Sequence, residues 1–377
     1  MKYIGFYDYP YSPIGRDNVL SASNKMTYIA HALCESGEFV QIVSQSQCSK
    51  SEHFMNKGCK IQISDRFGIY YFPAIGGANK VSRILGFFFR LIWLFFYLIF
   101  NTRKNEPVLV YHSIENYKVI QWAKVIKKFK LILEVEEVYQ DIRSLSNFAR
   151  KSELSVFRSA DAFVFSTELL IDKLNAENKP CVVVYGAYQK EERKSKRFND
   201  GFIHAVYAGT FDPQKGGAQN AVSATTYLPK GYHVHILGFG TKQDVEDIEA
   251  KIIDVQKTTK AKISYDGLLS GNEFIAFLQK CHIGLSTQNP EGKYNDTSFP
   301  SKILTYLASG LSVVSVKIPV LERCLVCDSI SFYTNSNPQE IAKSIVACNK
   351  DADNCEVIDY LDNQFKQNIR SFLESVN

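Results

Sequence analysis

Strand-like runs of apolar and β-branched residues alternate with amphipathic helical patterns along this chain, and the alternation is interrupted once. Strands that alternate with helices predict a parallel sheet, because each helix carries the chain back to the edge where the next strand begins. The interruption at residues 189–201 is highly charged and poor in apolar residues, so it cannot belong to a core and is the best linker candidate. We therefore expect two consecutive doubly wound α/β domains.

The expected elements form two series. Before the linker we expect strands at 2–7, 38–44, 68–72, 107–112, 130–136, 162–166 and 181–185, and helices at 22–33 and 114–128. After it we expect strands at 204–208, 233–237, 262–265 and 282–286, and helices at 218–226, 244–255 and 272–280. For a chain of 377 residues this predicts a first domain over 1–188, a linker over 189–202, a second domain over 203–355 and a helix over 356–377 that can cross back to the first domain.

The segment 298–315 has the pattern of a short helix that leads directly into a buried strand. Ser298 suits the N-cap, Pro300 suits the first turn, and Gly310 suits the left-handed residue after a helix. We expect this helix to begin at Ser298 or Phe299. The free N–H groups at its start would attract phosphate, and Lys302 could add a full positive charge there.

The same segment resembles the donor-binding helix of GT-B glycosyltransferases of family 4, through the run YLASGLSVV at 306–314. Three further stretches resemble motifs of that family in the same order: YAGTFDPQKG at 207–216, HILGFG at 235–240 and ISYDG at 263–267. The resemblance implies the GT-B fold, with two Rossmann-like domains that face each other across a cleft. It also implies transfer of a sugar from a nucleotide diphosphate donor.

The resemblance places the donor site in the second domain. It puts a phosphate-binding lysine at Lys215, in a loop whose glycines let the backbone approach a pyrophosphate. A solvent-exposed lysine is the alternative for Lys215 and for Lys302. The residues implied to bind the donor are Gly209, Thr210, Lys215, Gly216, Gly238, Ser298, Pro300, Ser301, Lys302 and Thr305. We expect no metal and no cofactor besides the nucleotide sugar, with UDP favoured as the nucleotide.

Three threonines depart from the family pattern. Thr210 stands where the family has an arginine after the glycine, so one phosphate-neutralising charge is missing. Thr297 and Thr305 stand where the family has paired glutamates, the second of which holds the donor ribose by its hydroxyls. Threonine is shorter and cannot accept both hydroxyls, and Glu291 is a candidate to supply a carboxylate instead. The stereochemistry of the transfer is therefore left open.

Acidic residues lie at the end of the expected strand 130–136. Glu136 and Glu137 align with the His-Asp pair that the family places beside the anomeric carbon, and either could act as the general base toward an acceptor hydroxyl. The alternative is a structural salt bridge, because buried charges need partners. On the acceptor side we expect Gly15 and Arg16 from the first loop and His112 from a strand end, with an ordinary turn and a structural histidine as the alternatives.

Residues 84–100, ILGFFFRLIWLFFYLIF, are the most apolar run of the chain. As a helix they would be about 25 Å long, slightly short of the bilayer core of about 30 Å, with Arg90 in the middle. Strands expected on both sides should share one sheet, which argues against spanning. Basic residues flank the run, so we expect it to lie on an anionic membrane surface. Burial in the core or in a homodimer is the alternative.

The net charge and the cysteine content limit the binding partners and the compartment that we expect. The net charge of +5 favours phosphates or acidic lipids and is too small to indicate nucleic acid. The nine cysteines follow no disulfide pattern, Cys324 and Cys327 lack a second pair for zinc, and no secretory signal is recognised. We therefore expect a cytoplasmic protein, peripheral on the inner face of the cell membrane.

These features predict a glycosyltransferase that transfers a sugar to a hydroxyl of a lipid-linked oligosaccharide, as in the assembly of a bacterial capsule or O-antigen. One alternative is a nucleotide-sugar epimerase with the same fold, which would need no apolar helix. The other is a non-catalytic partner subunit of a glycosyltransferase, which the missing arginine and glutamates favour.

Overall fold

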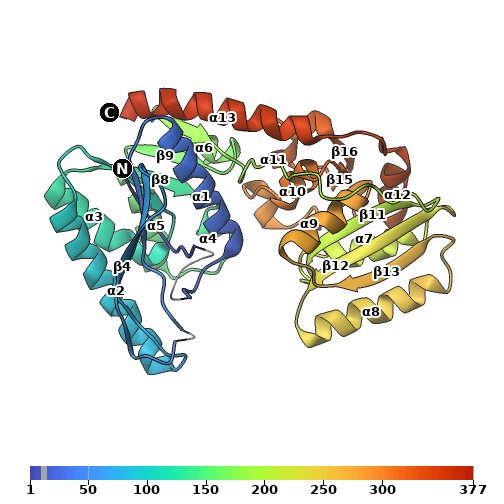
Figure 1. The fold of residues 1–377 in the computed structure, drawn as a ribbon, viewed down its shortest axis with the longest axis horizontal. Helices are drawn as coiled ribbons and strands as arrows, with labels where there is room; N and C mark the ends of the chain where they lie inside the picture. Colours follow the sequence, from blue (N-terminus) through green and yellow to red (C-terminus); the bar gives the residue numbers. More distant parts are fainter. Residues whose placement is uncertain (10–14, 50, 377) are drawn as a thin grey trace. The chain divides into compact units, whose positions relative to one another are not determined.

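The computed structural model describes residues 1–9, 15–49 and 51–376. These residues form two compact units (Figure 1). Unit 1 comprises Met1–Ala187 and Gln364–Asn377, and unit 2 comprises Tyr188–Asn363. Each unit contains a mainly parallel sheet with helices in its crossovers, which confirms the predicted α/β class with two Rossmann-like domains.

Unit 1 is built on an eight-stranded sheet in the order β10-β9-β8-β7-β1-β2-β5-β4, and its neighbours are parallel except for β4 with β5. Its strands are β1 (Lys2–Gly5), β2 (Val40–Ser44), β4 (Cys59–Gln62), β5 (Phe67–Tyr71), β7 (Pro107–Tyr111), β8 (Lys130–Val135), β9 (Ala162–Phe165) and β10 (Cys181–Val183). A separate antiparallel pair joins β3 (Met55–Asn56) to β6 (Ala74–Ile75).

The helices of unit 1 are α1 (Leu20–Glu35), α2 (Lys80–Asn101), α3 (Tyr117–Lys127), α4 (Tyr139–Ile142), α5 (Asn147–Ser159) and α6 (Leu169–Lys173), with the 3-10 turn η1 (Ile114–Asn116). The last turns of α13 (Cys355–Val376) also belong to unit 1. There Phe365 packs on Tyr28, and Lys366 pairs with Glu35 at 2.9 Å.

Helix α2 has a buried stripe and an exposed apolar stripe on opposite faces. One stripe, formed by Gly86, Arg90, Leu94 and Leu98, is buried in unit 1. The other stripe, formed by Phe88, Ile92, Phe96 and Phe100, is 52–77% exposed. By length and composition α2 is the helix of the described residues that could cross a membrane. Its buried stripe packs in the unit 1 core, where Leu94 and Leu98 are fully buried.

Unit 2 is built on a six-stranded parallel sheet in the order β13-β12-β11-β14-β15-β16. Its strands are β11 (Ile203–Thr210), β12 (Tyr232–Phe239), β13 (Lys262–Gly267), β14 (Ile283–Ser286), β15 (Ser312–Val316) and β16 (Ile330–Tyr333). Its helices are α7 (Gly217–Thr225), α8 (Lys242–Gln256), α9 (Gly271–Lys280), α10 (Lys302–Ala308), α11 (Pro319–Glu322), α12 (Pro338–Ala347) and the first turns of α13, with the 3-10 turns η2 (Lys293–Asp296) and η3 (Cys327–Ser329).

Each sheet changes winding direction once. In unit 1 the change lies between β1 and β7, and in unit 2 it lies between β11 and β14. At such a point the loops at the carboxyl ends of the two strands leave in opposite directions, so a crevice opens there in which open α/β sheets bind their ligands. The topology therefore directs attention to the residues that follow these strands.

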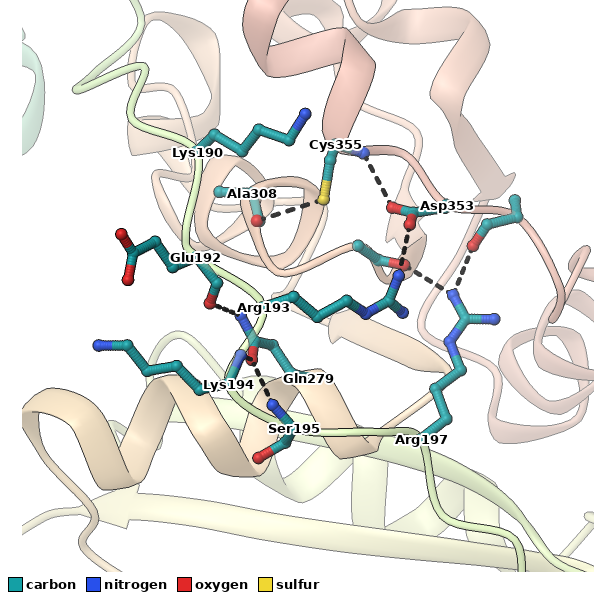
Figure 2. Close-up of polar contacts among 12 residues, drawn as sticks. Lys190, Glu192, Arg193, Lys194, Ser195, Arg197, Gln279, Ala308, Asp353 and Cys355 are labelled. Carbon is teal, nitrogen blue, oxygen red and sulfur yellow. Dashed lines mark hydrogen bonds and ion pairs between the residues drawn. The ribbon is translucent and has the colours of Figure 1, made fainter.

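The charged segment 189–202, our linker candidate, is part of unit 2. Figure 2 shows the side chain of Gln279 bonded to the backbone of this segment. Gln279 Oε1 accepts hydrogen bonds from Lys194 N at 2.7 Å and from Ser195 N at 3.1 Å. Arg197 donates to three backbone carbonyls, those of Gly310, Lys350 and Ala352. The arginine charge is thus used to satisfy carbonyl groups at element ends, which no apolar pattern could have indicated.

Candidate functional site

In unit 2 the carboxyl end of β11 adjoins the first turn of α10. The Lys302 ammonium lies over the ring of Tyr207, 4.1 Å from its centroid. A Cβ atom on Gly209 would lie only 2.9 Å from the same ammonium nitrogen. Gly209 therefore leaves the space in which the Lys302 side chain reaches the end of β11.

The charge of Lys302 is unbalanced. Burial, and secondarily the charge of Lys215, lower the pKa of Lys302 to about 7. The Lys215 ammonium lies 5.5 Å from the ring centroid of Tyr294. In the described part of the chain no ion pair joins either lysine to a carboxylate. Two ammonium groups held together without a counter-ion are suited to bind an anion with more than one charge.

Helix α10 begins at Lys302, so the expected start at Ser298 or Phe299 is wrong. Pro300 disfavours helical dihedrals for the residue before it, so the helix cannot extend back through Phe299. Its first bonds instead run from Ile303 N to Pro300 O and from Leu304 N to Ser301 O. Ser301 is exposed beside this turn, and Thr305 is half-buried one turn later.

Tyr306, which the sequence analysis did not single out, fixes α10 to the sheet. Its hydroxyl accepts from Ala208 N at 2.9 Å and donates to the Leu285 carbonyl at 3.3 Å, so it bridges β11 and β14 at the point where the winding changes. A Cβ on Gly284 would lie within 2.3 Å of the Tyr306 ring. A buried tyrosine in an apolar helix face carries no sequence signal for this role.

The remaining donor candidates shape the backbone around Gly209. Gly238 has φ of +145°, and a Cβ there would lie 1.8 Å from the Gly209 carbonyl oxygen, so only glycine fits. Gly216 has a left-handed conformation at the N-cap of α7. The Thr210 carbonyl at the end of β11 accepts from the Tyr207 hydroxyl at 2.9 Å. Tyr207 thus links the strand end to the lysine.

In unit 1 an acidic cluster forms at the end of β8. The Glu136 carboxylate pairs with Lys25 of α1 at 2.6 Å, and 27% of the Glu136 side chain stays exposed. Glu134 is fully buried and accepts from the Tyr3 hydroxyl. Burial, and then the charge of Glu136, raise the pKa of Glu134 to about 8. Glu137 follows with a half-buried side chain. Lys25 and Tyr3 were not predicted.

The acceptor-side candidates have different surroundings. His112 is 1% exposed, stacks on Tyr139 with centroids 4.6 Å apart, and lies 3.3 Å from Glu153. Burial lowers the pKa of His112 despite the Glu153 carboxylate, so the structural alternative suits it better. Arg16 is also buried, and its guanidinium donates to the Ser46 carbonyl at 3.0 Å. Gly15 is exposed, and the residues of its loop before it, 10–14, lie outside the described residues.

A pocket of about 500 Å³ in unit 1 was not predicted. Three arginines line it, Arg83 and Arg90 from α2 and Arg143 after α4. Of its two acids, Glu115 already pairs with Arg90 at 2.5 Å, and Asp17 accepts hydrogen bonds from Ser49. The pocket therefore carries a positive excess beside the loops that follow β1 and β7.

Neither a protein-family model nor a curated protein matches this sequence. Solved structures do match its fold. Sucrose-phosphate synthase from Thermosynechococcus elongatus is 12% identical, with a TM-score of 0.64 over 100% of this chain and 94% of that chain. HepE from Anabaena, solved in complex with UDP, is 12% identical, with a TM-score of 0.61 over 100% of both chains.

A third match is an alpha,alpha-trehalose-phosphate synthase (UDP-forming) from Burkholderia xenovorans, solved with glucose-6-phosphate. It is 10% identical, with a TM-score of 0.61 over 99% of this chain and 97% of that chain. Such matches at full coverage establish that this chain has the GT-B fold of glycosyltransferases. At these identities they establish the fold alone.

Proposed function

We propose that this chain is a glycosyltransferase that uses a nucleotide diphosphate sugar as its donor. The observation that carries the proposal is the pair of Lys215 and Lys302, which have no carboxylate partner among the described residues and lie where the unit 2 sheet changes winding direction. A diphosphate would supply the missing negative charge and would be stabilised further as it leaves the sugar. The UDP named with HepE and the UDP-forming synthase supports UDP as the nucleotide.

Donor binding in unit 2 would work without a metal ion. We assign donor binding to the glycine-lined end of β11, with Lys215 and Lys302 on the diphosphate, Ser301 just before α10 and Thr305 on it. Glu136 is assigned as the general base, because it is accessible and Lys25 orients it, and Glu137 remains the second candidate. We also propose that the chain belongs to glycosyltransferase family 4.

A screen of UDP, GDP and their sugars by thermal shift tests the donor assignment, because a ligand of the folded state raises the melting temperature. We expect stabilisation by one nucleotide series, with sugar transfer or slow hydrolysis by the intact protein. Release of an epimerised sugar and free nucleotide without acceptor would identify an epimerase. Binding without turnover of any donor would identify a non-catalytic subunit, and the absence of binding would refute the proposal.

For the acceptor we propose a phosphate-bearing, lipid-linked saccharide of bacterial surface polysaccharide assembly, such as capsule or O-antigen. The arginine pocket in unit 1 supports a phosphate group, since guanidinium pairs with phosphate in a bidentate geometry. Its neighbour α2 supports the lipid, because Arg83 and Arg90 of the pocket lie on the same helix as the exposed apolar stripe. Arg83→Gln should weaken transfer to lipid-linked acceptors without changing donor binding.

We further propose that the protein is peripheral on the cytoplasmic face of the membrane. Helix α3 packs against α2 and exposes further apolar side chains, Trp122, Val125 and Ile126, which are 58–75% exposed. Lys118 and Lys127 of α3 supply positive charge for an anionic leaflet.

Vesicle flotation tests this membrane surface. Phe88→Glu and Phe96→Glu should reduce binding to phosphatidylglycerol vesicles, while Phe39→Glu, at a 64% exposed site on a different element, should bind like wild type. If the Phe88→Glu and Phe96→Glu variants keep full vesicle binding, this surface is not the membrane contact. A wild-type dimer in sedimentation that those variants dissociate would assign the surface to a homodimer instead.

A further inference from the structure

Three histidines gather at the amino end of the unit 2 sheet. His204 is the second residue of β11, His233 lies beside it in the register of β12, and His235 follows two residues later on the same strand face. One ring nitrogen from each of the three lies within 4.8 Å of the others. His204 and His235 are 1% and 4% exposed, and His233 is half-buried.

Carboxylates hold the outer nitrogens of two of these rings. His204 Nε2 lies 2.9 Å from Asp200 Oδ1, and His235 Nδ1 lies 3.0 Å from Asp266 Oδ2. An ionised carboxylate only accepts hydrogen bonds, so each ring donates its N–H outward. The inner nitrogens, His204 Nδ1 and His235 Nε2, then carry lone pairs and face each other at 2.8 Å. Two lone pairs at this distance repel, so either one proton shared between the rings or a metal cation in its place must satisfy both.

We infer that His204, His233 and His235 bind a divalent transition-metal ion of the zinc type. Imidazole nitrogen is a preferred ligand of such ions, and metal-bound histidines usually donate their other N–H to a carboxylate, as Asp200 and Asp266 provide here. Nitrogens about 2.0–2.1 Å from a tetrahedral ion lie roughly 3.3–3.4 Å apart. A small rotation of the two facing rings therefore makes room for the ion, and water completes its coordination.

The charges and the access around the cluster suit a cation. Asp200 and Asp266 contribute two negative charges, which outweigh the one positive charge of the exposed Lys262, whose ammonium lies 4.0 Å from the ring centroid of Phe202. His282 accepts from the backbone N–H of His204 at 3.1 Å, so we assign it to support rather than to the metal. The half-buried ring of His233 gives an ion a path from solvent without opening the core.

The site is separate from the proposed donor site, and the inference does not depend on it. His204 and Gly209 lie near opposite ends of β11, five residues and thus roughly 16 Å apart. An ion at the amino end would join β11 to β12 and would stabilise this edge of unit 2. The alternating His-Val-His of 233–235 is its signal in the sequence.

Titration of the full-length, chelator-treated protein with Zn²⁺ tests the site. We expect one tightly bound ion per chain and a higher melting temperature, because the ion binds the folded state. His233→Ala and His235→Ala should each weaken binding by at least about tenfold, and Asp266→Asn by about ten- to 100-fold. His53→Ala removes an exposed histidine of unit 1 and should leave the affinity unchanged.

X-ray absorption of the wild-type zinc complex keeps the test decisive if a variant fails to fold. The chain has nine cysteines, and zinc bound to them would show sulfur at about 2.3 Å instead of imidazole nitrogen at about 2.0–2.1 Å. A nitrogen shell with imidazole scattering supports the inference. A sulfur shell, unchanged affinity in both histidine variants, or the absence of bound zinc would overturn it.

Discussion

Unit 1 and unit 2 both collect charged side chains at the carboxyl ends of their strands, but they balance these charges differently. In unit 1 the Glu136 carboxylate already has an internal counter-ion, Lys25, at 2.6 Å. In unit 2 the neighbouring Lys215 and Lys302 have no carboxylate partner among the described residues, and their mutual repulsion contributes to the lowered pKa of Lys302. The carboxylate of unit 1 therefore has its counter-ion in place, whereas the two lysines of unit 2 are left for the proposed diphosphate to neutralise.

Glu136→Gln should produce the largest effect if the unit 1 carboxylate is the general base. A positioned base contributes about 10²–10⁴-fold to a rate, so we expect kcat of transfer to fall by that factor while the donor Kd stays unchanged. Rates measured with saturating donor and acceptor test this. Glu137→Gln is the matched control, and a large loss in that variant alone would move the role to Glu137. Full activity in both variants would mean that neither residue is the base.

Lys302→Met should abolish the charge imbalance of unit 2. A hydrogen bond to a charged group is worth about 1.5–3 kcal/mol, so the affinity for UDP should fall by about ten- to 100-fold in calorimetry. Without ligand the variant should melt no lower than wild type, because a half-buried charge that is poorly solvated has been removed. Lys242→Met, at a side chain that is 92% exposed, serves as the control and should change neither quantity. If Lys302→Met keeps the wild-type affinity for UDP, the Lys302 charge does not contribute to diphosphate binding.

The pH dependence of UDP binding is a second test of the role of Lys302. In the ligand-free protein the pKa of Lys302 is about 7, and a bound diphosphate would raise this pKa. Above pH 7, UDP binding is therefore accompanied by uptake of a proton. The affinity should be level below about pH 7 and fall by up to tenfold per unit above it. The Lys302→Met variant corrects for titration of the diphosphate itself and should lack this additional fall. An equal pH profile in both proteins would contradict the assigned role of Lys302.

The fold was largely predictable because apolar periodicity reports burial directly. The strand expected at 107–112 is observed as Pro107–Tyr111, and the one expected at 204–208 as Ile203–Thr210. Strand β4 was missed because its residues alternate between half-buried and exposed at the edge of the sheet and form no apolar run. The start of α10 was misplaced because a cap residue and a proline suit several positions in one turn.

The candidate site was predictable only where a local motif marks it. Lys302 and Gly209 were singled out from separate motifs, but their close approach follows from the register of β11 and β14, which no single motif encodes. Lys25 and Glu136 are 111 residues apart, and the sequence around neither residue predicts that the two form a pair. Partnership and burial, which set the charge of each group, are thus properties of the tertiary structure.

Glu134→Gln tests how the acidic cluster of unit 1 affects stability, and we expect it to have the smallest effect of these variants. The pKa of Glu134 is raised from its ordinary value to about 8, so the folded state holds a proton that the unfolded chain has lost between about pH 4.5 and pH 8. This contribution makes wild-type stability fall as pH rises through that window. A glutamine oxygen can still accept from Tyr3, so the variant should keep its fold and lose part of this slope, with a melting temperature a few degrees above wild type at pH 8. Melting curves between pH 5 and pH 8 measure it, and an unchanged slope would show that the cluster balances Glu134 as completely as it balances Glu136.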